Sequence, residues 1–104
     1  MSSEELQYVL ALQHIPNLGD TLAKKLIRHF GSAKNVLQQK KQNLLKIDGI
    51  GGYRLRDFFD ATHLKAAEEE LKFIEKNQIK VLYFKDQDYP DKLKHCIDGP
   101  MLLF

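Results

Sequence analysis

The chain has 104 residues, of which 43% are hydrophobic and 29% are charged, and its formal net charge is +2. This composition excludes a disordered chain, because a globular protein of this size can bury about two thirds of its unfolded surface. No apolar run approaches a membrane span, the N-terminus lacks a secretory signal pattern, and Cys96 is the only cysteine. We therefore predict a small cytoplasmic protein without an intrachain disulfide.

The basic residues are unevenly placed along the chain. Residues 14–56 carry nine lysines or arginines against Asp20 and Asp48, so this window has a charge of +7 and the remainder about −5. A basic window suits a polyanionic partner, because neutralising phosphates releases counterions and provides affinity that does not depend on base sequence. Solvated helix faces are the alternative explanation, since surface lysines often serve that purpose.

The predicted elements begin with a helix of about ten residues, in which Ser2 and Glu5 have the spacing of a capping box. Pro16 ends this helix, because the residue before a proline is disfavoured in the helical region. Apolar residues recur at helical spacing between positions 22 and 30, and Gly31 is suited to the C-terminal cap of that second helix. Ser32 is then the predicted N-cap of a short third helix. The polar run 38–43 is predicted to be a connector.

In the second half of the chain, the sequence pattern changes from helical to strand-like at Ile79. Residues 53–59 have a helical pattern, and Thr62 starts the clearest amphipathic helix, with apolar residues on one face and charged residues on the other. The nearly continuous apolar run 79–84 is typical of a buried parallel strand. Pro90 is suited to the first position of a short helix. Residues 101–104 predict a second strand, which we interpret as the start of a domain that is cut short.

Two glycine-containing segments, thirty-two residues apart, repeat one pattern. In residues 46–54, Gly49 and Gly51 lie between two helical patterns and permit a tight turn. In residues 14–23, Asn17 and Gly19 take the equivalent positions, and Asn enters left-handed conformations more readily than most residues. The alignment keeps the large apolar positions and the second glycine: Leu12, Ile15, Leu18, Gly19 and Leu26 fall on Leu44, Ile47, Ile50, Gly51 and Phe58.

A turn of this kind, followed by a helix, is predicted to bind a phosphate. Outward-facing amides and the positive end of the helix dipole both favour an anion. A plain interhelical turn with a glycine cap is the alternative. Asp20 favours that alternative at the first hairpin, because its carboxylate would compete with phosphate. The predicted phosphate-binding residues are Leu18, Gly19, Thr21, Lys24, Lys25, Lys46, Gly49, Ile50, Gly51, Gly52 and Arg54.

Both segments resemble helix-hairpin-helix units, and the C-terminal tail resembles a more specific family. The residues Asp88-Tyr89-Pro90, Leu93, Cys96-Ile97-Asp98, Pro100 and Leu102-Leu103-Phe104 resemble the start of the Rossmann-like domain in the DNA-processing protein A (DprA/Smf) family. With the hairpins, the resemblance covers the whole chain. It implies a mainly α fold at 1–77, with two helix-hairpin-helix repeats and about five helices, sometimes described as SAM-like. Residues 78–104 would be a short β-strand and turn remnant of a following α/β domain.

The same resemblance implies a bacterial cytoplasmic protein that binds incoming single-stranded DNA during natural transformation and DNA recombination and helps to load the RecA recombinase. In that family the main single-strand site and the dimer surface lie in the Rossmann-like part. The expected function here is therefore that of an accessory module that binds DNA without sequence preference, duplex included, with a homodimer as a further expectation. A protein interaction module whose hairpins are only structural is the alternative.

Enzyme motifs do not emerge from the sequence. Arg54 occupies the position where a dinucleotide fingerprint needs a third small residue, and no predicted strand precedes that segment. The four histidines and Cys96 do not have the spacing of zinc ligands. We therefore expect no catalytic residue, no metal and no cofactor.

Overall fold

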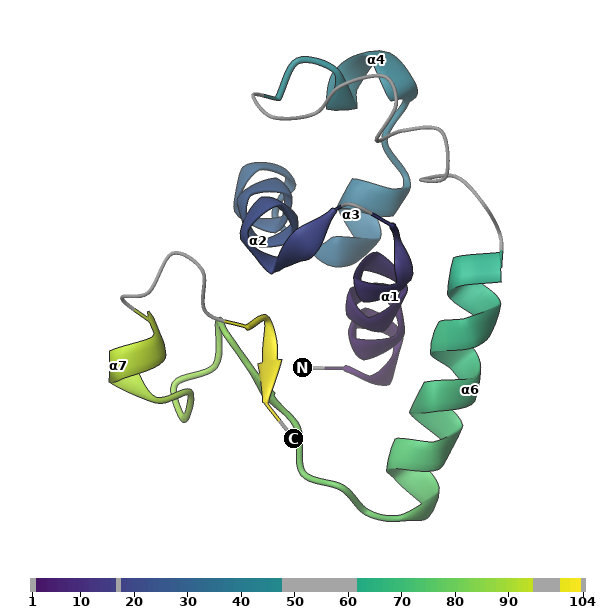
Figure 1. Ribbon diagram of the computed structural model, residues 1–104, viewed down its shortest axis with the longest axis vertical. Helices are drawn as coiled ribbons and strands as arrows, with labels where there is room; N and C mark the ends of the chain where they lie inside the picture. The colour runs from purple at the N-terminus through teal and green to yellow at the C-terminus, as the bar shows by residue number, and fades with distance from the viewer. Residues whose placement is uncertain (1, 17, 48–61, 95–99, 104) are drawn as a thin grey trace.

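The structure, a computed structural model, describes residues 2–16, 18–47, 62–94 and 100–103. Within these ranges the protein is mainly helical, as the sequence predicts, and carries one small sheet (Figure 1). The helices are α1 (Ser3–His14), α2 (Gly19–Phe30), α3 (Ala33–Leu37), α4 (Lys41–Leu44), α6 (Thr62–Lys76) and α7 (Asp91–Lys94), and the strands are β1 (Leu82–Tyr83) and β2 (Leu102–Leu103). No helix in the described ranges is long and apolar enough to cross a membrane.

The boundaries of the first three helices follow from local sequence. The Ser2 Oγ accepts a hydrogen bond from the Glu5 amide at 3.1 Å and caps α1, which ends two residues before Pro16. Gly31 ends α2 with φ +97, a conformation that favours glycine. The Ser32 Oγ accepts from the Asn35 amide at 3.1 Å and caps α3. All three predicted capping residues are confirmed, but the Ser2–Glu5 capping box is only half formed, because the Glu5 carboxylate accepts from the Ala33 amide of α3.

Helix α1 is the central element of the fold. It packs against α2, α3 and α6, and its contact with α6 is the most extensive of these (Figure 1). Val9 and Leu10 of α1, Leu26 and Ile27 of α2, and Ala67 of α6 are fully buried. Burying a side chain such as Leu or Ile contributes roughly 1.5–3 kcal/mol, so these apolar stripes determine which faces of the helices meet.

The C-terminal segment folds back onto the helices through an antiparallel pair. Strand β1 pairs with β2 in the register Leu82↔Leu103 and Tyr83↔Leu102, and the Phe84 amide donates to the Met101 carbonyl at 2.9 Å. The predicted parallel strand at 79–84 was therefore wrong in direction and too long, because pairing depends on a partner distant in sequence. The buried side chains of this segment are Tyr83, Phe84, Tyr89, Met101 and Leu102, and they belong to the same hydrophobic core as α1 and α2.

Other expectations have mixed outcomes. The polar run 38–43 is not only a connector, because helix α4 begins within it and ends at the fully buried Leu44. The short helix expected after Pro90 is present as α7. The helical pattern at 53–59 lies outside the described residues. The division into 1–77 and 78–104 stays a prediction, although residues of both ranges share the core.

Candidate nucleic-acid interface

The first hairpin lies between α1 and α2 and is held by two apolar anchors. Ile15 and Leu18 are buried, and the Leu18 amide donates to the Ile15 carbonyl at 3.4 Å. Gly19 begins α2 with φ +71, and no heavy atom lies within 4 Å of the place where a Cβ would be. The glycine is therefore required by its backbone conformation and not by crowding. Asn17 lies outside the described residues.

The N-terminus of α2 presents backbone donors at the surface. Gly19 and Thr21 are exposed, and the preceding residue, Leu18, makes no side-chain capping hydrogen bond to α2. The first amides of a helix lack intrahelical acceptors, so this turn can accept an anion. Asp20 accepts a hydrogen bond from the Met101 amide through Oδ2 at 3.2 Å. The carboxylate that could compete with phosphate is thus engaged by the C-terminal segment.

The predicted site lysines of the two repeats lie in different environments. Lys25 and Lys46 are exposed, and Lys46 follows α4. Lys24 is only 3% exposed, and its Nζ lies 5.9 Å from the centroid of the Phe84 ring. The structure therefore brings Lys25, but not the ammonium of Lys24, to the surface beside the first hairpin.

Of the segment that forms the second hairpin, the structure describes only Lys46 and Ile47. Ile47 is buried and its amide donates to the Leu44 carbonyl at 3.1 Å, so the chain is anchored in the core just before that hairpin. The predicted site residues of this hairpin, which lie outside the described residues, are Gly49, Ile50, Gly51, Gly52 and Arg54. Their role as phosphate ligands stays a prediction.

Two further cations near α2 were not among the predicted site residues. Arg28 is exposed, and its Cζ lies 5.2 Å from the centroid of the Phe84 ring. The Lys85 Nζ donates to the carbonyl of Gly31, at the C-terminal end of α2, at 3.1 Å. The spacing of Thr21, Lys25 and Arg28, at i, i+4 and i+7, was the sequence signal that could have identified Arg28, because it places all three on one face of the helix.

Acidic groups gather elsewhere, mainly on α6. Glu70 of α6 forms an ion pair with His14 at the end of α1, and Glu68 pairs with Lys72 at 3.5 Å. On α3, the partly exposed Lys34 pairs with Glu4 at 2.6 Å, and this hydrogen-bonded pair raises the pKa of the lysine. The charge separation predicted from sequence therefore corresponds to a basic α2 and a more acidic α6.

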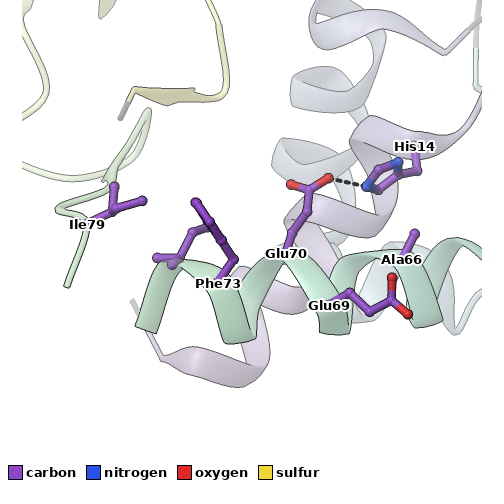
Figure 2. A pocket seen from close by; sticks show the side chains of 7 residues that line it. His14, Ala66, Glu69, Glu70, Phe73 and Ile79 are labelled. Carbon is purple, nitrogen blue, oxygen red and sulfur yellow. Dashed lines mark ion pairs between the residues drawn. The ribbon is translucent and has the colours of Figure 1, made fainter. Parts of the chain in front are cut away.

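An apolar pocket lies between α6 and the C-terminal residue of α1, His14. It has a volume of about 570 Å³ and its residues are His14, Ala66, Glu69, Glu70, Phe73, Ile74 and Ile79. Figure 2 shows Phe73 and Ile79 near one end and the ion pair of His14 with Glu70 near the other. Phe73 is 62% exposed and adds apolar surface beside this pocket.

The part of the chain that the structure describes holds no cluster of metal-ligating side chains. No group of three or more His, Cys, Asp or Glu side chains there could hold a metal ion. His95 and Cys96 lie outside the described residues.

Comparisons with known proteins connect this geometry to one motif. A profile described as the helix-hairpin-helix motif matches residues 7–67, more than half of the chain. A proposed ATP-dependent RNA helicase of Methanocaldococcus jannaschii is 34% identical over 56 residues, which are 54% of this chain and 7% of that protein. The UvrABC system protein C of Bifidobacterium longum is 34% identical over 53 residues, which are 51% of this chain and 7% of that protein.

A second UvrABC system protein C, from Frankia casuarinae, is 42% identical over 41 residues, which are 39% of this chain and 6% of that protein. The matched segments thus span less than a tenth of each of these relatives. No solved structure matches the chain significantly. What the chain shares with these relatives is the general helix-hairpin-helix motif, and the resemblance to the DprA/Smf family depends on the residues of the C-terminal segment.

Proposed function

Because this chain belongs to the helix-hairpin-helix family, we propose that it is a non-enzymatic module that binds DNA through phosphates and without sequence preference. The observation that carries the proposal is the first hairpin, where Gly19 has φ +71 at the start of α2, inside the matched residues 7–67. The amides of that turn and the exposed Lys25 can contact phosphate oxygens. Contacts of this kind position a protein on DNA but do not read its bases.

The finer assignment that we propose is the accessory N-terminal part of a cytoplasmic protein of the DprA/Smf type. Such a protein would bind single-stranded DNA and assist a RecA-type recombinase during natural transformation. The N-terminal part would bind duplex DNA. One structural feature supports the tail motif on which the assignment depends. The buried Tyr89 donates its hydroxyl to the Pro100 carbonyl at 2.6 Å, so two residues of the motif hold each other in place.

The test is a titration of the chain with labelled single-stranded and duplex DNA over a series of salt concentrations. We expect weak binding and, if about four phosphates of a duplex are contacted, a slope of log affinity against log salt near −3.6. Gly19→Val should weaken binding by the first hairpin and Gly51→Val by the second, whereas Lys72→Ala on α6 is the matched control. Tight binding with a flat salt response, or no binding at all, would refute the proposal.

A protein interaction module is the second candidate, and the apolar pocket beside α6 favours it. Phe73 is the exposed apolar side chain that a partner would cover. We expect Phe73→Ser to weaken binding of a purified RecA-type recombinase and to leave DNA binding unchanged. If Phe73→Ser has no effect on recombinase binding measured by light scattering or interferometry, this candidate function fails at that pocket.

A further inference from the structure

Phe84 gathers two cations of α2 over one aromatic ring. The Cζ of Arg28 lies 5.2 Å and the Nζ of Lys24 lies 5.9 Å from the ring centroid. The ring itself is fixed, because Phe84 is buried and its amide donates to the Met101 carbonyl at 2.9 Å. Phe84 is therefore a rigid platform beside a helix whose N-terminus is the proposed phosphate site.

The platform changes what Arg28 can do. A guanidinium over an aromatic face is attracted by the ring quadrupole, and it keeps its N–H donors at the edges for other partners. Among the described residues, the ion pairs join other side chains, and no carboxylate there lies within ion-pair distance of Arg28. Arg28 is exposed, so its donors can reach a phosphate. Its contact with the Phe84 ring already restricts the side chain, so less side-chain entropy is lost on binding.

The position of Arg28 along α2 fits a strand that already contacts the first hairpin. Thr21, Lys25 and Arg28 lie on one face of the helix, and all three are exposed. Gly19 and Arg28 are nine residues apart in the helix, or about 13 Å along its axis. Measured along the axis of duplex DNA, where the charges of one strand are about 3.4 Å apart, this length corresponds to roughly four nucleotides. One strand lying along α2 can therefore place phosphates at both ends.

We propose that Arg28 is a second phosphate-binding residue, several nucleotides from the first hairpin, and that Phe84 positions it. This inference depends on the proposed DNA-binding function. Phe84 lies beyond residues 7–67, which match the helix-hairpin-helix profile. The C-terminal segment is thus part of the nucleic-acid interface of this chain, through a side chain that does not touch the DNA.

The experiment measures the affinity of the whole 104-residue chain for a fluorescein-labelled oligonucleotide, single-stranded and duplex, between about 50 and 200 mM salt. Arg28→Ala should lower the affinity by roughly tenfold or more, the loss of one charge-assisted contact. It should also reduce the salt slope by about 0.9 on duplex DNA and about 0.7 on a single strand. Lys72→Ala removes the same charge from α6 and should change neither quantity.

The positioning role of Phe84 needs a readout that a structural role would not alter. Phe84→Leu is therefore measured in the wild-type chain and in the Arg28→Ala variant, with circular dichroism as the check of folding. We expect Phe84→Leu to weaken binding only where Arg28 is present, and Phe84→Tyr to restore it. If Phe84→Leu does not fold, the affinities of Phe84→Tyr and Arg28→Lys are measured in place of that variant. Phe84→Tyr should then bind as wild type does, while Arg28→Lys should lose part of the affinity because lysine lacks the planar fork.

The outcomes separate the two proposals. A wild-type chain that does not bind either oligonucleotide refutes the proposed function and this inference with it. If the wild type binds and Gly19→Val weakens it, while Arg28→Ala behaves as Lys72→Ala does, only the second phosphate contact is overturned. Equal losses from Phe84→Leu with and without Arg28, or wild-type affinity in Arg28→Lys when that replacement is used, overturn the positioning role.

Discussion

Replacing Tyr83 with phenylalanine should make the protein more stable. Tyr83 is buried, and its hydroxyl has no hydrogen-bond partner among the described residues. A buried polar group without a partner costs about 1–3 kcal/mol, and phenylalanine keeps the ring while removing that group. We expect the free energy of unfolding of Tyr83→Phe to rise by about 1 kcal/mol. For a domain of this size, that corresponds to an increase in melting temperature of roughly 4–8 °C.

The same substitution at Tyr89 is the matched comparison and should have the opposite sign. The Tyr89 hydroxyl donates to the Pro100 carbonyl at 2.6 Å, so Tyr89→Phe leaves that carbonyl without this donor. We expect a loss of about 1–3 kcal/mol. Urea denaturation followed by circular dichroism gives both values, and an unchanged m-value would show that the denatured state is not altered.

A pH series extends the test. Burial raises the pKa of the Tyr83 hydroxyl, and the nearby carboxylates of Glu5 and Asp86 raise it further. In the unfolded chain a tyrosine ionises near pH 10, whereas in the fold the Tyr83 hydroxyl stays neutral to higher pH. The wild type therefore keeps its full stability below about pH 10 and loses stability as the pH rises above it, because ionisation favours the unfolded chain. The stability difference between Tyr83→Phe and wild type should therefore widen above about pH 10. A Tyr83→Phe protein that is less stable than wild type at neutral pH, or a difference that stays constant to high pH, would refute this reasoning.

Three further expectations concern the backbone. Gly19→Ala should lower the free energy of unfolding by about 1 kcal/mol, because Gly19 has φ +71, and Gly19→Asn should lower it by less. Equal stability of the wild type and both variants in urea would show that the turn relaxes. Gln78→Gly should raise the free energy of unfolding by up to about 1 kcal/mol, since Gln78 has φ +51, and a lower melting temperature would contradict this. Asp20→Ala should speed hydrogen exchange at the Met101 amide, because this amide donates to Asp20. The Ile79 amide, which donates to the Ile74 carbonyl, is the internal reference. Unchanged exchange at Met101 would show that its bond to Asp20 is not formed in solution.

Helix boundaries could be predicted from sequence because their determinants are local. Ser2, Gly31 and Ser32 act through hydrogen bonds or dihedral angles within a few residues, and each has the predicted capping role. Helix α4 was missed because its residues are polar, and the buried Leu44 at its end contributes through the core and not through a repeating pattern. Strand β1 was predicted in the wrong direction and too long because its partner, β2, follows it by almost twenty residues, and pairing over such a distance depends on tertiary packing.

The candidate site shows the same division. Gly19 was identified from a pattern of spacing, because its positive φ is a property of the turn itself. Lys24 was predicted to contact phosphate, but the C-terminal segment covers that side of α2, and nothing near Lys24 in the sequence signals Phe84. The spacing of Arg28 from Thr21 and Lys25 could have identified it as a surface cation, but its contact with Phe84 could not be predicted. Its environment depends on a residue more than fifty positions away, so only the folded structure relates the two.

The Glu5 side chain ties the beginnings of two helices together, and this has a consequence for how the domain folds. Its Oε1 accepts the Ala33 amide at 2.5 Å, in the first turn of α3, while its own amide is capped by Ser2 in the first turn of α1. A helix of five residues such as α3 is not stable alone, because nucleation costs more than so few hydrogen bonds return. Helix α3 should therefore form and melt together with α1 as one cooperative unit, although eighteen residues separate them in the sequence.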